Sequence, residues 1–166
     1  MKSAIYPGSF DPVTLGHIDI IERASKMFEE VTICVLDNKA KSPLFSVEER
    51  VKMLRIVCED LPNVRVDSYY GLTVEYAKQI GAHVLIRGLR AVTDFEFELQ
   101  LAQTNRMLSK NKVDTVFLTT SAKYSYLSSS GVREIAAFGG DISRCVTPYV
   151  EEQIWKKLHK KPQTDQ

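Results

Sequence analysis

The stretch YPGSFDPVTLGH, residues 6–17, joins a strand-like run to a helical pattern. Gly8 removes a side chain where the backbone has to turn and approach another group closely. Pro12 stiffens the turn. The helix that follows begins within this stretch, and its free N–H groups and positive dipole end attract phosphate. The stretch therefore predicts a strand-to-helix turn that binds an anion, with Ser9 and His17 as hydrogen-bond donors.

Strand and helix patterns alternate along the whole chain. Strands are expected at residues 2–6, 31–36, 64–69, 83–86 and 113–119. Helices are expected at residues 16–30, 46–61, 73–80, 93–109, 129–138 and 148–159. Ser46 and Glu49 form a capping box at the start of the second helix. This alternation predicts a parallel sheet covered by helices on both faces.

We therefore expect an α/β fold: a single doubly wound, Rossmann-like domain with a five-stranded parallel sheet. The domain should span residues 1–160, and residues 161–166 should form a frayed tail. Ligands of such folds bind beyond the carboxyl ends of the strands. The residues that directly follow each strand are therefore the candidate site residues.

The composition is that of a globular protein, with 44% hydrophobic and 26% charged residues. A net charge of +1 gives no strong overall attraction to nucleic acid or to a membrane surface. No apolar run approaches the roughly 20 residues of a membrane span, and no signal peptide is recognisable. Cys34, Cys58 and Cys145 lack any CxxC pair and are expected to be reduced core thiols. We expect a cytoplasmic protein with no nucleic-acid or membrane partner.

The stretch IRGLRAVTDFEFELQLAQTN, residues 86–105, carries a second group of candidates. Arg87 and Arg90 directly follow the fourth predicted strand, and their planar guanidinium groups suit phosphate oxygens. Glu98 and Asn105 are seven residues apart, so they share one face of the next helix. The positions on that helix expected to face a core are Phe95, Leu99 and Ala102.

Two further features complete the candidate site. The stretch YSYLSSSGVRE, residues 124–134, places three serines before a helix, where hydroxyl and N–H groups can bind a phosphate chain. Lys41, in the loop after the second strand, can bring a flexible positive charge over the site. Each feature has a plainer interpretation: the serines could only cap a helix, and Lys41 could be an ordinary solvated lysine.

The other candidates have plainer interpretations too. Thr14 could cap a helix beside a merely solvated His17. Glu98 and Asn105 could form a solvated polar face. The two arginines could pair on the surface with the acidic residues Asp94 and Glu96, and such pairs contribute little to stability.

These stretches together are similar to a known family. TLGH, residues 14–17, resembles the TxGH signature of the nucleotidyltransferase superfamily related to class I aminoacyl-tRNA synthetases. With IRGLRAVTDFEFE and the serine triplet, the chain from residue 4 to residue 157 resembles the phosphopantetheine adenylyltransferase family. The resemblance implies transfer of the adenylyl group of ATP to 4′-phosphopantetheine, giving dephospho-coenzyme A and pyrophosphate in coenzyme A synthesis.

The resemblance also implies how the chemistry is carried out. The acceptor phosphate attacks the α-phosphate in line, with no covalent enzyme intermediate. Mg²⁺ is implied as cofactor, held by the ATP phosphates and water with no protein ligand. A homohexamer is implied as well, and feedback binding of coenzyme A is left open.

Site residues are carried over position by position. The catalytic positions are His17, as transition-state stabiliser, Lys41 and Arg90. The ATP-binding positions are Ser9, Phe10, His17, Gly88, Leu89, Arg90, Glu98, Tyr124, Ser125, Tyr126, Leu127, Ser128, Ser129 and Ser130. The positions for 4′-phosphopantetheine are Ser9, Lys41, Leu72, Thr73, Arg87 and Asn105. The departures from the family pattern, at Ser9, Phe97, Tyr124, Leu127 and Gly131, remove no charge or donor that this chemistry needs.

Other functions remain compatible with the first motif. A nucleotidyltransferase acting on nicotinamide mononucleotide or on a phospho-alcohol would share it but should lack the second stretch. A regulatory nucleotide-binding domain should lack His17 or the arginines. A protein that only oligomerises would need none of these residues.

Overall fold

The computed structural model describes residues 3–37, 42–90 and 94–159. The strands in these ranges are β1 (Ser3–Gly8), β2 (Glu30–Leu36), β3 (Val64–Tyr69), β4 (Val84–Leu89) and β5 (Asp114–Thr119). The helices are α1 (Leu15–Met27), α2 (Val47–Val57), α3 (Thr73–Ile80), α4 (Asp94–Leu108), the 3₁₀ helix η1 (Ala122–Tyr124), α5 (Ser129–Ala137) and α6 (Pro148–Lys157). Lys41 and the predicted frayed tail lie outside the described residues.

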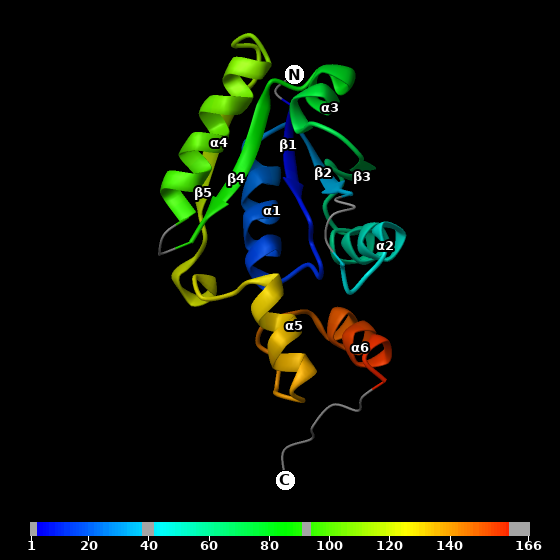
Figure 1. The fold of residues 1–166 in the computed structure, drawn as a ribbon. Coiled ribbons are helices and arrows are strands. Elements are labelled where there is room, and N and C mark those ends of the chain that lie inside the picture. The colour runs from blue at the N-terminus through cyan, green and yellow to red at the C-terminus, as the bar shows by residue number, and fades with distance from the viewer. Residues whose placement is uncertain (1–2, 38–41, 91–93, 160–166) are drawn as a thin grey trace.

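The five strands form one parallel sheet in the order β3-β2-β1-β4-β5 (Figure 1). The chain builds outward from β1 to β3, then crosses back so that β4 lies on the other side of β1. The strand order therefore reverses between β1 and β4, which is where doubly wound folds bind their ligands. The predicted α/β fold class is confirmed.

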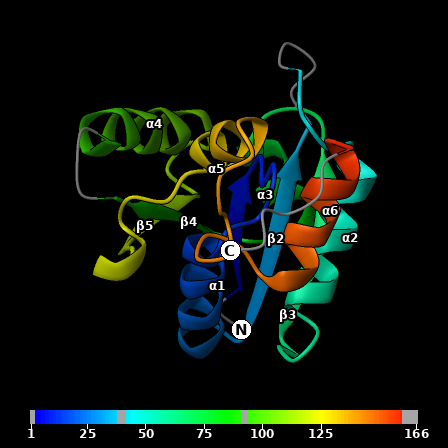
Figure 2. The same cartoon turned by 90° about the horizontal axis from the view of Figure 1, so that it is seen from below.

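Helices cover both faces of the sheet: α1 and α4 lie on opposite sides of it when it is viewed end-on (Figure 2). Alternate residues of a strand point to opposite faces. Ala4 and Tyr6 accordingly belong to the large core under α1 and α2, whereas Ile5 packs with the α3 residues Tyr76 and Ala77.

The last two helices, α5 and α6, lie beyond the carboxyl ends of the strands (Figure 1). Thr147 caps α6, and Pro148 occupies its first turn. Val150 and Ile154 are fully buried in the large core, so α6 is packed on the domain and does not form a loose tail.

Two strands run past their predicted carboxyl ends. β1 runs to Gly8, and β4 runs to Leu89, which pairs with Thr119 of β5. Arg87 therefore lies within β4, and the prediction that it follows the strand is wrong. The β1–β4 ladder itself ends at the pair Ile5–Leu85. Beyond that pair the two strands share no ladder, and side chains can enter between them.

The predicted core stripe of α4 is wrong for Phe95 and Leu99, whereas its third member, Ala102, is half-buried on the same face as Glu98. The Phe95 and Leu99 side chains are 55% and 38% exposed, whereas Glu98 is buried. Glu98 and Asn105 do share one face, as predicted, and that face is the less exposed one. α4 therefore turns Glu98 toward the sheet, where Arg87 pairs with it. The periodicity of the helix sequence does not predict this pairing.

The remaining composition-based expectations concern thiols and membranes. Cys34, Cys58 and Cys145 are buried and free, as expected of reduced core residues. Among the described helices, none is long and apolar enough to cross a membrane.

α1 ends at Met27, earlier than predicted, since β2 already begins at Glu30.

Candidate active site

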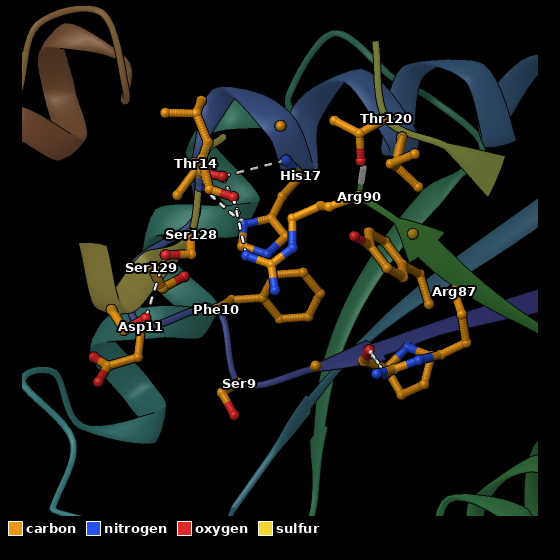
Figure 3. A pocket seen from close by; sticks show the side chains of 18 of the residues that line it. Ser9, Phe10, Asp11, Thr14, His17, Arg87, Arg90, Thr120, Ser128 and Ser129 are labelled. Carbon is orange, nitrogen blue, oxygen red and sulfur yellow. Dashed lines mark hydrogen bonds between the residues drawn. The ribbon is translucent and has the colours of Figure 1, made fainter. Parts of the chain in front are cut away.

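A cavity of about 460 Å³ opens at the carboxyl ends of β1 and β4, where the strand order reverses (Figure 3). Its walls come from the β1–α1 turn, the end of β4, one face of α4 and the start of α5. Predicted site residues that line it are Ser9, Phe10, His17, Arg87, Gly88, Arg90, Glu98, Tyr124, Leu127, Ser128, Ser129 and Ser130. The fold thus brings together residues from the three stretches chosen from sequence.

The β1–α1 turn is built around the Phe10 ring. Phe10 has φ of 49°, in the left-handed region that non-glycine residues rarely adopt, at a cost of about 1–3 kcal/mol. The ring is 2% exposed and lies edge-on to Tyr6 and His17, with centroid distances of 5.3 and 5.0 Å. A Cβ on Gly8 would approach the same ring to 3.0 Å. Burial of Phe10 therefore offsets the backbone strain and fixes the position of His17.

His17 is held by a capping box at the start of α1. The Thr14 N–H donates to His17 Nδ1 at 3.0 Å, and Thr14 Oγ1 accepts from the His17 N–H at 3.4 Å. Because Nδ1 accepts this bond, a neutral imidazole carries its proton on Nε2. The capping interpretation of Thr14 is thus confirmed, but His17 is not merely solvated: it lines the cavity.

The surroundings of His17 disfavour the charged imidazolium. Its pKa is lowered from 6.5 to about 4, mainly by burial and then by the positive charges of Arg90 and Arg87. Arg90 extends from the end of β4 toward the imidazole (Figure 3). A neutral Nε2–H donor beside two guanidinium groups can stabilise negative charge in the cavity without itself transferring a proton.

The lowered pKa of His17 predicts how stability depends on pH. Between pH 6.5 and about 4 the unfolded chain binds a proton at His17 and the folded chain does not. The free energy of unfolding should therefore fall as pH falls through that window. Urea unfolding at several pH values, compared with His17→Gln, measures this contribution. A wild-type pH dependence identical to that of H17Q would contradict it.

Arg87 and Glu98 form a bidentate ion pair inside the cavity. Arg87 Nε donates to Glu98 Oε2 at 2.7 Å, and Nη2 donates to Oε1 at 2.6 Å. Arg87 Nη1 also donates to the Pro7 carbonyl at 3.1 Å, across the gap where the β1–β4 ladder has ended. Glu98 is therefore paired with Arg87, and the alternative of a merely solvated Glu98 is wrong.

The serine triplet links α5 to the β1–α1 turn. Ser128 caps α5 by accepting from the Gly131 N–H at 3.0 Å, so the capping interpretation is confirmed for this serine. Ser129 Oγ donates to the Pro12 carbonyl at 2.7 Å. Arg90 Nη1 donates to the Leu127 carbonyl at 3.3 Å just before the triplet. The end of β4, the turn and α5 are therefore tied together around the cavity.

Some predicted site residues do not line this cavity. Leu72 precedes α3 and is 56% exposed, and Thr73 is the first residue of that helix. Asn105 lies further along α4, on the same face as Glu98. The other residues away from the cavity wall are Leu89, Ser125 and Tyr126, and Lys41 lies outside the described residues. Their predicted roles stay predictions.

Three charged residues line the cavity that sequence reasoning assigned no role in binding: Asp11, Arg50 and Arg133. Asp11 lies within the first quoted stretch, directly before Pro12, but nothing in that stretch indicates a partner for its carboxylate. Arg50 directly follows the capping-box residue Glu49. Nothing in local spacing shows that these residues meet, because 33 or more positions separate Asp11 from its partners.

Carboxylates that line the cavity are already engaged. Glu98 binds Arg87, and both oxygens of Asp11 accept backbone N–H groups. Within the described ranges, no group of three or more His, Cys, Asp or Glu side chains could hold a metal ion.

Comparison with known proteins places this geometry in context. The family described as cytidylyltransferase-like matches residues 5–135. A phosphopantetheine adenylyltransferase from Lachnoclostridium phytofermentans is 59% identical over 161 residues, covering 97% of this chain and 98% of the relative. One from Dictyoglomus thermophilum is 52% identical over 162 residues, covering 98% of each chain.

A solved structure from Vibrio parahaemolyticus, of a protein provisionally assigned as a nicotinate-nucleotide adenylyltransferase, has the same fold. It superimposes with a TM-score of 0.71 over 97% of each chain, at 22% sequence identity. At that identity the likeness concerns the fold alone.

Proposed function

Because the chain belongs to the phosphopantetheine adenylyltransferase family, we propose that it transfers the adenylyl group of ATP to 4′-phosphopantetheine. The products are dephospho-coenzyme A and pyrophosphate. The chain is an enzyme, a nucleotidyltransferase of coenzyme A synthesis. One observation supports the site best: a neutral His17 and two guanidinium groups converge on one cavity at the switch point of the sheet.

The proposed step is a direct displacement at phosphorus. An oxygen of the acceptor phosphate forms a bond to the α-phosphorus of ATP, and the bond from that phosphorus to the bridging oxygen of pyrophosphate breaks. Negative charge increases on the α-phosphate oxygens in the transition state. His17 Nε2–H and Arg90 would stabilise that charge, and no side chain needs to act as a nucleophile.

Orientation of the two substrates would supply much of the remaining rate enhancement. The ATP side of the site would be formed by Ser9, Phe10, the end of β4 and the segment 124–130, whose residues largely line the cavity. Arg87 would bind the acceptor phosphate, with Ser9 contacting both substrates. Lys41, Leu72, Thr73 and Asn105 are proposed for the acceptor from the family resemblance.

Magnesium is the proposed cofactor. When bound, it neutralises charge on the ATP phosphates. Since Asp11 and Glu98 are engaged within the protein, the ion would be held by phosphate oxygens and water. The chain's own contribution would be to hold the triphosphate through N–H, hydroxyl and guanidinium donors.

Assembly, regulation and location are further proposals. A homohexamer would cover some of the large apolar side chains that this single chain exposes, such as Phe95 and Phe138. Coenzyme A shares the pantetheine arm of the acceptor and would bind the same cavity as a feedback ligand. We propose a cytoplasmic enzyme with one catalytic domain over residues 1–160.

Pyrophosphate release by the purified protein tests the proposed reaction. With ATP and Mg²⁺, release is expected with 4′-phosphopantetheine and not with nicotinamide mononucleotide or glycerol 3-phosphate. All three acceptors carry a phosphate that the arginine cluster can bind, so the expected selection rests on the substrate of the family.

The other outcomes are equally informative. Release with another acceptor alone would keep adenylyl transfer and overturn the substrate. Silence with all three acceptors, from folded protein that binds ATP, would favour a regulatory nucleotide-binding domain.

A further inference from the structure

Segment 42–46, which leads into α2, is held by a buried carboxylate from another part of the chain. Asp11 Oδ2 accepts from the Leu44 N–H and Asp11 Oδ1 from the Phe45 N–H, both at 2.9 Å. Asp11 is 5% exposed and Phe45 is 2% exposed. Buried backbone donors need partners, and here two consecutive donors share one carboxylate.

The carbonyl groups of the same segment are bound by a buried cation. Arg50 is 3% exposed, and its Nε donates to the Phe45 and Ser46 carbonyls at 3.1 and 3.3 Å. Its Nη1 donates to the Ser9 carbonyl at 2.8 Å and the Leu36 carbonyl at 3.4 Å. All of its hydrogen-bond partners within the described ranges are therefore backbone carbonyls.

This arrangement connects three separate parts of the cavity wall. One guanidinium joins the β1–α1 turn at Ser9, the end of β2 at Leu36 and the segment before α2. A planar fork with donors in fixed directions can do this, and the single nitrogen of a lysine cannot. Arg133 of α5 adds a link, donating to the Asp11 carbonyl and lying 3.5 Å from Asp11 Oδ2.

We propose that Arg50 and Asp11 are positioning residues, which set the placement of Ser9 and of segment 42–46 in the cavity wall. This inference rests on the proposed function, because Ser9 is the proposed contact for both substrates. Ser42 and Pro43 line the same cavity, so a shift of the segment alters the cavity's shape. Misplacing a substrate contact by about 1 Å can lower a rate roughly 100-fold.

The matched test compares Arg50→Lys with Arg55→Lys. Arg55 lies on the same helix and also donates to a carbonyl, that of Val66 at 3.3 Å, but it is exposed and is not among the residues that line the cavity. We expect R50K to lower kcat about 10- to 100-fold. KM for ATP should stay within about threefold, since the hydrogen bonds of Arg50 among the described residues go to backbone carbonyls of the wall. A shift of that wall is expected to disturb the alignment of the reacting groups more than substrate binding. R55K should leave both constants unchanged.

A purely structural arginine would give a different result. R50K would then melt at a lower temperature, while kcat and KM of the folded enzyme, measured well below that temperature, would match the wild type. That outcome overturns the proposal. If R50K does not fold, Asp11→Asn provides the same comparison, because it keeps the side-chain shape and removes one of the two acceptor oxygens.

Hydrogen exchange tests the inference without any acceptor. Amides in peptides covering residues 7–11 and 42–46 should exchange faster in R50K and D11N than in the wild type or R55K. If the wild type releases no pyrophosphate with 4′-phosphopantetheine, the proposed reaction fails while this comparison still stands. Unchanged exchange in both segments would overturn the positioning role by itself.

Discussion

Replacing His17 with alanine is expected to lower kcat by about 100- to 1,000-fold, the cost typical of losing one preorganised donor to a transition-state oxyanion. Affinity for ATP should change far less, because a neutral Nε2–H contributes little to binding until charge increases on the α-phosphate. The capping box fixes this donor, and the low pKa keeps the imidazole neutral at physiological pH. His17→Ala therefore separates transition-state stabilisation from binding.

Steady-state kinetics and calorimetric ATP binding, measured on the same preparation, check this prediction. His83→Ala is the control, since His83 is exposed and its Nδ1 contacts only the Lys112 carbonyl among the described residues. Loss of the His17 contact to the Thr14 N–H should also cost helix stability, on the order of 1 kcal/mol. Equal losses in ATP binding and in kcat would contradict the transition-state role.

How far the sequence predicts this protein depends on the range of the signal. Alternating strand and helix patterns are local, so the doubly wound sheet and most element positions could be predicted. The strand ends could not: β4 extends through Arg87 and Gly88 because β5 offers a parallel partner. The periodicity of the β4 sequence does not show which strand will pair with it.

In the candidate site, too, local features could be predicted and long-range contacts could not. Motif resemblance identifies His17, Arg87 and the serine triplet, which do line one cavity. It does not reveal that Phe10 adopts a left-handed conformation, because that conformation is stabilised by ring packing. Nor does it reveal the contacts of Arg50, whose partners include a carbonyl 41 positions away. Long-range polar contacts of single residues leave no repeating pattern to read.

Replacing Arg87 with alanine is expected to have the second large effect, on both acceptor use and stability. The variant removes the proposed phosphate ligand, which should raise KM for 4′-phosphopantetheine by roughly 30-fold or more, about 2 kcal/mol. It also leaves Glu98, whose side chain is 9% exposed, without its bidentate partner. Removing one member of a buried pair destabilises by about 3–5 kcal/mol, and partial solvent access to Arg87 favours the lower end.

The two consequences can be separated with Glu98→Gln. In the double variant R87A/E98Q no charge is stranded, so much of the lost stability should return, while acceptor use stays impaired. Chemical denaturation and acceptor KM, measured for both single variants and the double, complete the cycle. Arg106→Ala is the control on α4: its pair with Asp114 is exposed, 3.4 Å long and worth at most about 1 kcal/mol.

This cycle distinguishes a substrate ligand from a structural ion pair. If Arg87 only neutralised Glu98, the double variant would recover both stability and acceptor KM. If Arg87 binds the acceptor phosphate, the double variant should recover stability but not acceptor KM. The glutamine of E98Q fills the space of Glu98 without a buried negative charge, but it supplies no cation for the phosphate. E98Q by itself should lower acceptor use only modestly, since Arg87 keeps its bond to the Pro7 carbonyl and remains aimed across the open end of the β1–β4 ladder. Recovery of acceptor KM in the double variant would therefore remove Arg87 from the proposed binding site.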